Sequence, residues 1–222
     1  MISFAIDFKT YKRAISALKE SSYALLFPSF CLSCSLNLEK DSTFLCNQCV
    51  EQLCLLEPLN QDLGGHKKGS GFCPKAACFD YFGAIEAVVS TFRSARMLHL
   101  AEPLAAYLLI QHDRLNWPNP DIVTCVPESR LLSKLKGAHP NELLACSLSK
   151  MIGSTFIPLT KKRYYGVGKA HIVQHPTAHL AKGKTVLLID TLFGQETENT
   201  KKILQEITPH AIYILTLCKK EE

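Results

Sequence analysis

The sequence predicts an α/β domain whose sheet is mostly parallel and flanked by helices, preceded by a small cysteine-rich module. The segment 185–197, TVLLIDTLFGQET, holds four consecutive apolar residues that end at Asp190, and a helical pattern follows. A strand that is apolar on both faces is typical of a parallel sheet covered by helices. A second such strand at 121–126 and two Cys-x-x-Cys pairs near the N-terminus support the same architecture.

The remaining elements follow from apolar periodicity. We expect a strand and then a helix within 79–92, and a helix at 102–110 with a proline in its first turn. Another helix is expected at 141–151 and a closing strand at 212–217. The helix after Asp190 carries its apolar face on Ile203, Leu204 and Ile207. Because ligands of open α/β sheets bind at the carboxyl ends of strands, Asp190 is a candidate site residue.

Length and composition limit the possible functions. The chain has 222 residues, 47% of them apolar, which suffices for one α/β domain and a small appendage. Its net charge of +5 permits a polyanionic partner without requiring one. No apolar run approaches the roughly 18 residues that a membrane-spanning helix needs, and the N-terminus is a poor secretory signal. We therefore expect a cytoplasmic protein without membrane insertion.

The two Cys-x-x-Cys pairs have the spacing of a tetrahedral zinc site. Eleven residues separate Cys31-Leu-Ser-Cys34 from Cys46-Asn-Gln-Cys49, and disulfides are rare in the cytosol. The predicted metal ligands are Cys31, Cys34, Cys46 and Cys49. Because sulfur would fill all four positions, the zinc would be structural. The alternative is four unligated thiols in a small hairpin.

Another cysteine pair, Cys73 and Cys78, has the spacing Cys-x₄-Cys. It is either an alternative source of metal ligands or a remnant, and burial among apolar residues is the simpler expectation. The same expectation holds for the remaining cysteines of the domain, Cys125, Cys146 and Cys218. Between the module and the domain, the stretch 64–71, GGHKKGSG, is typical of a linker. We predict an N-terminal helix and the cysteine module in 1–63 and the α/β domain in 72–222.

The turn after Asp190 resembles the 5-phosphoribosyl-1-diphosphate (PRPP) loop of type I phosphoribosyltransferases, in which two acids precede a Thr-Thr-Gly run that wraps a ribose 5-phosphate. Three segments are similar to the ComF (ComFC) family of competence proteins. They are LLFPSFCLSC at 25–34, DIVTCVPESRLLSKLKG at 121–137 and GKTVLLID at 183–190. The resemblance implies a type I phosphoribosyltransferase-like fold with an N-terminal zinc module. It also implies a cytoplasmic function in handling single-stranded DNA during natural transformation, in association with a competence helicase.

The loop departs from the family pattern. Asp190 keeps the first acid, for which the resemblance implies the catalytic role of orienting the ribose. The resemblance places the PRPP contacts on Thr191, which replaces the second acid, and on Gly194, Gln195 and Thr197. Glu196 also falls in the loop, and a carboxylate within ~5 Å of a phosphate costs on the order of several kcal/mol unless it turns outward. We predict weak or absent transferase activity, with Mg²⁺ bound alongside PRPP only if the pocket is active.

Two further segments bear on the pocket. After the strand 121–126, the resemblance implies a pyrophosphate-binding turn that carries Arg130, Lys134 and Lys136, while an ordinary basic loop has the same composition. In the segment that covers the active site of the family, three histidines recur at intervals of four. Pro176 lies within this run and makes a single helix improbable, so we expect strand or loop histidines rather than a metal site. The neighbouring Tyr164 and Tyr165 could stack on bases of single-stranded DNA.

Three functions therefore stay open at this point. The first is a competence protein that handles single-stranded DNA with little catalysis of its own. The second is a working phosphoribosyltransferase that uses PRPP and Mg²⁺, with Asp190 orienting the ribose. The third is a non-catalytic adaptor that docks on a DNA helicase. The sequence does not indicate an acceptor substrate or an oligomeric state.

Overall fold

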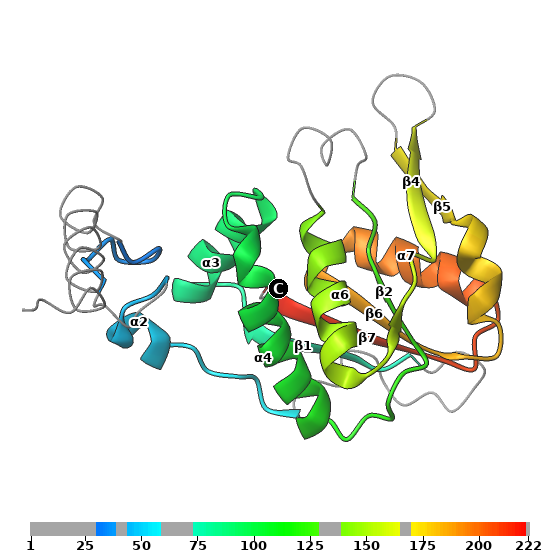
Figure 1. Cartoon of the computed structure of the whole chain (residues 1–222), viewed down its shortest axis with the longest axis horizontal. Coiled ribbons are helices and arrows are strands. Elements are labelled where there is room, and N and C mark those ends of the chain that lie inside the picture. The colour runs from blue at the N-terminus through cyan, green and yellow to red at the C-terminus, as the bar shows by residue number, and fades with distance from the viewer. Residues whose placement is uncertain (1–29, 39–43, 59–72, 129–138, 165–169, 221–222) are drawn as a thin grey trace, which may run out of the picture. The chain divides into compact units, whose positions relative to one another are not determined.

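The computed structural model describes residues 30–38, 44–58, 73–128, 139–164 and 170–220. The chain divides into two compact units, Met1–Gln52 and Leu53–Glu222, and Figure 1 colours them along the chain. The predicted linker at 64–71 lies outside the described residues, so the domain boundaries derived from it stay a prediction.

The described part of the first unit consists of two turns that present the cysteines. In the first turn, the backbone N–H of Ser35 donates to the carbonyl of Cys31 at 3.0 Å. The second turn opens helix α2 (Asn47–Glu51), where the N–H of Cys49 donates to the carbonyl of Cys46 at 3.0 Å. Cys31 and Cys49 are buried together with Leu45. Each Cys-x-x-Cys pair is thus held by a tight turn over a very small core.

The second unit is built on a parallel sheet of five strands in the order β1-β7-β6-β2-β3. The strands are β1 (Lys75–Asp80), β2 (Ile122–Cys125), β3 (Thr155–Phe156), β6 (Thr185–Leu192) and β7 (Ala211–Lys219). The central strand β6 pairs with β2 through Val186 and Ile122, and with β7 through Val186 and Ile212. The predicted mostly parallel sheet is confirmed.

Helices cover both faces of this sheet (Figure 1). They are α3 (Ala84–Arg93), α4 (Ala101–Arg114), α6 (Pro140–Ile152) and α7 (Gln195–Glu206), with short 3₁₀ segments η2 (Leu98–Leu100) and η3 (Pro176–Ala181). Helices α4 and α6 pack against each other on one face, and α7 packs on the other. In the described parts of the chain, no helix has the length and apolar character needed to cross a membrane.

Strand β6 shows why this arrangement forms. Its side chains alternate between the two faces, and both faces are apolar. Val186 and Leu188 pack against Leu204 of α7 in one continuous core cluster, while Leu187 and Ile189 point to the opposite face and are also fully buried. Burying each such side chain stabilises the fold by roughly 1.5–3 kcal/mol. A surface strand could not accommodate this pattern.

One strand differs from the expectation in its length, and one hairpin was not predicted as an element. Strand β6 does not end at Asp190 but continues to Leu192, because Asp190 and Leu192 both pair with the long strand β7. The segment that follows β3 forms an antiparallel hairpin of β4 (Thr160–Tyr164) and β5 (Ala170–Gln174). The histidines of this region lie in β5, directly after it, and in η3. As expected from Pro176, no single helix carries them.

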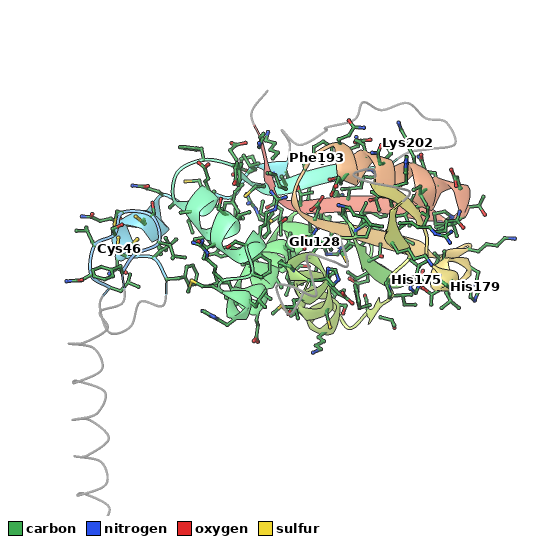
Figure 2. The ribbon with its side chains drawn as sticks, turned by 90° about the horizontal axis from the view of Figure 1, so that it is seen from above. Cys46, Glu128, His175, His179, Phe193 and Lys202 are labelled. Atoms are coloured by element: carbon green, nitrogen blue, oxygen red, sulfur yellow. The ribbon has the colours of Figure 1, made fainter. Side chains whose placement is uncertain are left out.

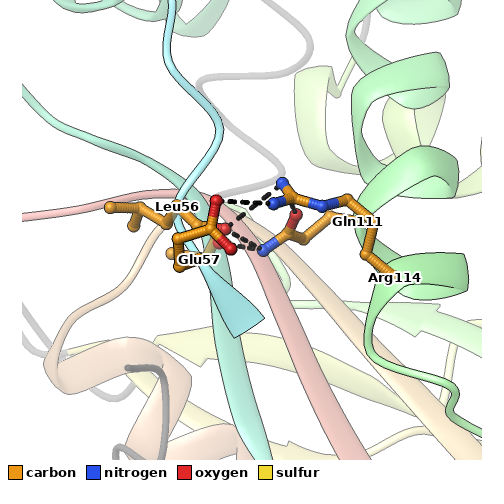
Figure 3. A network of polar contacts seen from close by, with 5 residues as sticks. Leu56, Glu57, Gln111 and Arg114 are labelled. Atoms are coloured by element: carbon orange, nitrogen blue, oxygen red, sulfur yellow. Dashed lines mark hydrogen bonds and ion pairs between the residues drawn. The ribbon is translucent and has the colours of Figure 1, made fainter. Parts of the chain in front are cut away.

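A polar clamp fixes the segment 53–58, here called the strap, to the edge strand β1. The backbone N–H of Leu56 donates to the carbonyl of Cys78 at 2.8 Å. From α4, the fully buried Gln111 donates through Nε2 to the carbonyls of Leu56 and Ala77 at 2.9 and 3.3 Å. Arg114 donates to Oε1 of Gln111 and pairs with Glu57 at 3.2 Å (Figure 3). The strap is therefore joined to the edge strand β1 directly at Cys78 and through Gln111 at Ala77.

We expect Gln111→Met to lower the free energy of unfolding of the second unit by about 2 kcal/mol, since it leaves carbonyls of the clamp without their donor. Methionine keeps the length and volume of the side chain. Trp117, the single tryptophan, packs on Tyr213 of β7, with 5.1 Å between the ring centroids. Its fluorescence therefore reports unfolding of this unit. Gln174→Met, at an exposed glutamine, should change stability by less than ~0.5 kcal/mol. Equal losses in the two variants would contradict a special role of the clamp.

Candidate functional site

A cleft of about 650 Å³ opens at the carboxyl end of β6. The turn from Leu192 to Thr197, which leads from β6 into α7, forms one wall. Other walls come from the end of α3, the loop after β2, the start of α6 and the hairpin strand β4. The cleft lies where open α/β sheets bind ligands, as the sequence predicted.

Asp190 lies at the base of the cleft and is held by hydrogen bonds to both carboxylate oxygens. Oδ1 accepts from Nδ2 of Asn141 at 3.0 Å and from the backbone N–H of Thr191 at 2.8 Å. Oδ2 accepts from Oγ1 of Thr197 at 2.6 Å. The residue is only 6% exposed. The carboxylate thus joins the start of α6 to the start of α7 and offers little free surface to a ligand.

The environment of Asp190 also changes its acidity. Burial raises the pKa of the carboxyl from 3.8 to about 6, against the opposing effect of hydrogen bonds from Thr197 and Asn141. Desolvation penalises the charged form more than these donors stabilise it. The carboxylate still predominates at pH 7.

Thr191, predicted to take the place of the second acid, does not line the cleft. It lies within β6, so its side chain points to the opposite face of the strand from Asp190. It is 0% exposed, and its Oγ1 has no hydrogen-bond partner in the described structure. The structure therefore brings the carboxylate of Asp190, but not the hydroxyl of Thr191, to the predicted ribose position.

The predicted phosphate residues at the start of α7 do line the cleft. Gly194 precedes the helix, and its N–H donates to Oγ1 of Thr197 at 3.2 Å. Thr197 is fully buried and bonded to Asp190, so its hydroxyl stabilises the turn. Gln195 donates to Asn199 one turn along the helix. A helix start of this kind leaves backbone N–H groups without intrahelical partners, and these groups favour an anion.

Glu196 is paired with a lysine that the sequence did not single out. Nζ of Lys162 in β4 lies 2.5 Å from Oε1 of Glu196. The Lys162 side chain is 12% exposed and that of Glu196 is 58% exposed. The repulsion expected between Glu196 and a bound phosphate is thus opposed by a cation at the same place.

Other elements also contribute to this cleft, among them Glu128 and Lys220, which sequence reasoning did not assign to it. Arg93 at the end of α3 and Lys220 after β7 supply further positive charge, and Glu128 after β2 supplies a carboxylate. These residues lie far apart in the chain, and the fold brings them to one cleft. Arg130, Lys134 and Lys136, predicted to bind pyrophosphate, lie outside the described residues.

A smaller cavity of about 160 Å³ adjoins the cleft beneath the hairpin. The two share Glu128, Asn141 and Lys162. His175 also lines the smaller cavity, and its Nδ1 lies 2.7 Å from Oγ1 of Thr177. His179 lies nearby in η3 (Figure 2) and is bonded to the carbonyl of Pro176.

The first unit carries the cysteine cluster that is predicted to bind zinc. One sulfur from each of the four predicted ligands lies within 4.8 Å of every other, and these residues are Cys31, Cys34, Cys46 and Cys49. Sγ of Cys34 lies 3.6 Å from Sγ of Cys46, close to the ~3.8 Å that tetrahedral Zn–S bonds of ~2.3 Å require. Figure 2 shows the sulfurs gathered around Cys46. Four thiolates at this spacing fit a structural zinc ion and leave it no open position for substrate.

Four cysteines of the sheet domain are core residues, namely Cys73, Cys78, Cys125 and Cys218. Cys78 in β1 is fully buried and donates to the carbonyl of Tyr107 at 3.6 Å. Cys73 packs in the core cluster on the α7 face of the sheet. Burial raises the pKa of Cys73 to about 11 and raises the pKa of Cys78 well above its ordinary value. Cys125 and Cys218 are buried as expected, and Cys146 is half-buried.

Comparison with known proteins gave matches in structure alone. No protein-family model matches the chain, and no curated protein matches its sequence. The chain is similar to a hypoxanthine phosphoribosyltransferase from Staphylococcus aureus, with 15% identity and a TM-score of 0.33, over 58% of this chain and 68% of that one. It is similar to a purine phosphoribosyltransferase from Pyrococcus horikoshii, with 15% identity and a TM-score of 0.38, over 55% of this chain and 73% of that one.

A third similar structure is a larger enzyme, the glutamine phosphoribosylpyrophosphate amidotransferase from B. subtilis complexed with ADP and GMP. The identity is 13% and the TM-score 0.37, over 56% of this chain. This chain spans 26% of that enzyme.

Proposed function

We propose that the chain is a ComF-like competence protein that handles single-stranded DNA in the cytoplasm, built on a phosphoribosyltransferase-like domain with weak or no transferase activity. The observation that carries the proposal is the state of the predicted ribose site. Asp190 uses both of its oxygens to hold Asn141 and Thr197, and Thr191 is buried on the other face of β6. The cleft therefore lacks the pair of free acidic groups that the PRPP loop uses for the ribose hydroxyls.

The requirements of phosphoribosyl transfer also support weak or absent activity. Transfer of a phosphoribosyl group needs stabilisation of a departing pyrophosphate, which depends on preorganised cations and N–H groups. Here the mostly buried cation of the cleft, Lys162, is already neutralised by Glu196. A ligand phosphate would have to compete with a carboxylate of the chain itself. This arrangement supports a retained fold with reduced ligand affinity.

The zinc module and the basic hairpin support the DNA part of the proposal. Strand β4 carries three consecutive basic residues, Lys161, Lys162 and Arg163, and Arg163 is exposed. Phosphate contacts of this kind give affinity that falls with salt and carries no sequence preference. The helicase is the partner that the family resemblance implies.

We expect calorimetric titration of zinc-loaded protein with PRPP and Mg²⁺ to give no measurable heat below the millimolar range. In the same preparation, a fluorescent single-stranded oligonucleotide should bind with an affinity that decreases steeply with salt. Arg163→Ser should lower the magnitude of the salt slope by about 0.7, the value for one phosphate contact on a single strand. Absence of salt-dependent oligonucleotide binding would contradict the DNA assignment.

A working phosphoribosyltransferase is the second candidate, favoured by the size of the cleft and by Arg93 and Lys220 on its walls. Micromolar PRPP binding, lost in the isosteric variant Asp190→Asn, would establish this candidate. Release of pyrophosphate in the presence of an acceptor would then identify the reaction.

A further inference from the structure

The ion pair between Lys162 and Glu196 links two elements across the mouth of the cleft. Lys162 lies on β4, the first strand of the hairpin, and Glu196 lies in the first turn of α7. The hairpin strands pair only with each other among the described strands. The 2.5 Å contact between Nζ and Oε1 is therefore an anchor that ties the hairpin to the helix start.

The two partners differ in how easily they can leave this contact. The side chain of Lys162 is 12% exposed, so its ammonium group is largely removed from water and needs an anion beside it. The side chain of Glu196 is 58% exposed and can return to solvent at little cost. If the pair opens toward a ligand, Glu196 is the partner that moves.

The place that Glu196 occupies is suited to an oxyanion. It lies at the start of a twelve-residue helix, where backbone N–H groups favour negative charge. Lys162 of β4 supplies a cation that faces this helix start, and Lys162 and Glu196 both line the cleft. A phosphate group that replaced the carboxylate would meet the same cation and the same N–H groups.

We propose that Glu196 is an internal competitor for the oxyanion site: its carboxylate holds Lys162 until a phosphomonoester takes its place. This inference rests on the proposed function, because it treats the cleft as a retained sugar-phosphate site of reduced affinity. Exchange of one anion for another leaves Lys162 paired in both states. Glu196 thus lowers the affinity of the cleft for a phosphate group. When the phosphate group binds, it replaces Glu196 as the partner that holds Lys162 and the hairpin in place.

The test uses inorganic phosphate as the probe and compares three variants of the full zinc-loaded chain. Glu196→Gln removes the competitor, and we expect its Kd for phosphate to fall by about tenfold relative to the unmodified chain. Lys162→Met removes the cation and should abolish binding. Glu198→Gln is the matched control, because Glu198 loses the same charge from the same helix turn but pairs with Lys75 outside the cleft. Its Kd should stay within about twofold of the unmodified chain.

Hydrogen exchange of the β4 amides gives an independent readout. Without phosphate, Glu196→Gln should exchange faster over residues 160–164 than the unmodified chain, and saturating phosphate should restore protection. An equal gain in affinity for Glu196→Gln and Glu198→Gln would overturn the proposal in favour of general electrostatics, and so would unchanged β4 exchange. Turnover of PRPP by the unmodified chain would instead count against the proposed function. It would leave this inference standing, because the ratio of the phosphate Kd values of Glu196→Gln and Glu198→Gln does not depend on turnover.

Discussion

Removal of zinc is expected to unfold the first unit while the sheet domain stays folded. The described part of this unit buries few apolar side chains, among them Leu45, and two of its buried residues are the proposed ligands Cys31 and Cys49. So small a core cannot offset the conformational entropy of the segment. Structural zinc contributes roughly 10–16 kcal/mol of folding free energy at pH 7. The free energy lost with the zinc should therefore be larger than the free energy of unfolding of this unit.

Cysteine variants give the measurement and its control. Purified chain should contain one zinc ion, and Cys49→Ser should reduce the content well below that. Cys54→Ser is matched, because Cys54 is exposed and lies outside the cluster; it should keep the full content. Limited proteolysis should then cut within 30–52 only in Cys49→Ser or after chelation, with the fluorescence of Trp117 unchanged. Full zinc content in Cys49→Ser would contradict the assigned ligand set.

The second large effect concerns Asp190 and pH. Because the folded-state pKa is raised, the protonated carboxyl is favoured by folding. This contribution is complete below pH 3.8 and is lost as the pH rises through about 6. Asp190→Asn cannot titrate, so its free energy of unfolding relative to the unmodified chain should rise by about 2 kcal/mol between pH 4.5 and pH 7.5, at ~1.4 kcal/mol per pKa unit.

Urea unfolding followed by Trp117 fluorescence at pH 4.5, 6 and 7.5 measures this difference for the sheet domain alone. The rearranged hydrogen bond to Thr197 in the variant adds a cost that does not depend on pH, so the change with pH is the informative quantity. Asp121→Asn, at a half-exposed carboxylate that pairs with Lys184 at 3.9 Å, is the control. Its effect on the free energy of unfolding controls for the loss of one surface charge. A difference for Asp190→Asn that is constant with pH would show that the carboxyl is not destabilised by burial.

Some of the cleft could be anticipated from local sequence, and some could not. Asp190, Gly194, Gln195 and Glu196 follow directly after the apolar run of β6, so their place at the end of a parallel strand was predictable. Lys162 and Asn141 reach the same cleft from β4 and α6, and neither lies in a recognisable motif. Their role depends on which elements pack side by side, which apolar periodicity does not encode.

Thr191 shows that the sequence did not predict where strand β6 ends. A continuous strand places neighbouring side chains on opposite faces, but where a strand ends depends on its partner. The pairing of Leu192 with Cys218 of β7 extends β6 past Asp190, and this pairing buries Thr191. The position aligned with an acid in the family loop is therefore not a cleft position here.

The sequence by itself determined the parallel sheet, the helices on both its faces and the four clustered cysteines, because each is specified by local spacing: apolar runs for buried strands, helical periodicity and paired Cys-x-x-Cys turns. The tertiary structure decided which charges meet. In the folded chain, both oxygens of Asp190 accept hydrogen bonds from residues of two helices. Glu196 pairs with Lys162 of the hairpin, and Gln111 holds the strap. Such contacts join residues far apart in the chain, and their energies depend on burial and distance, which exist only once the chain has folded.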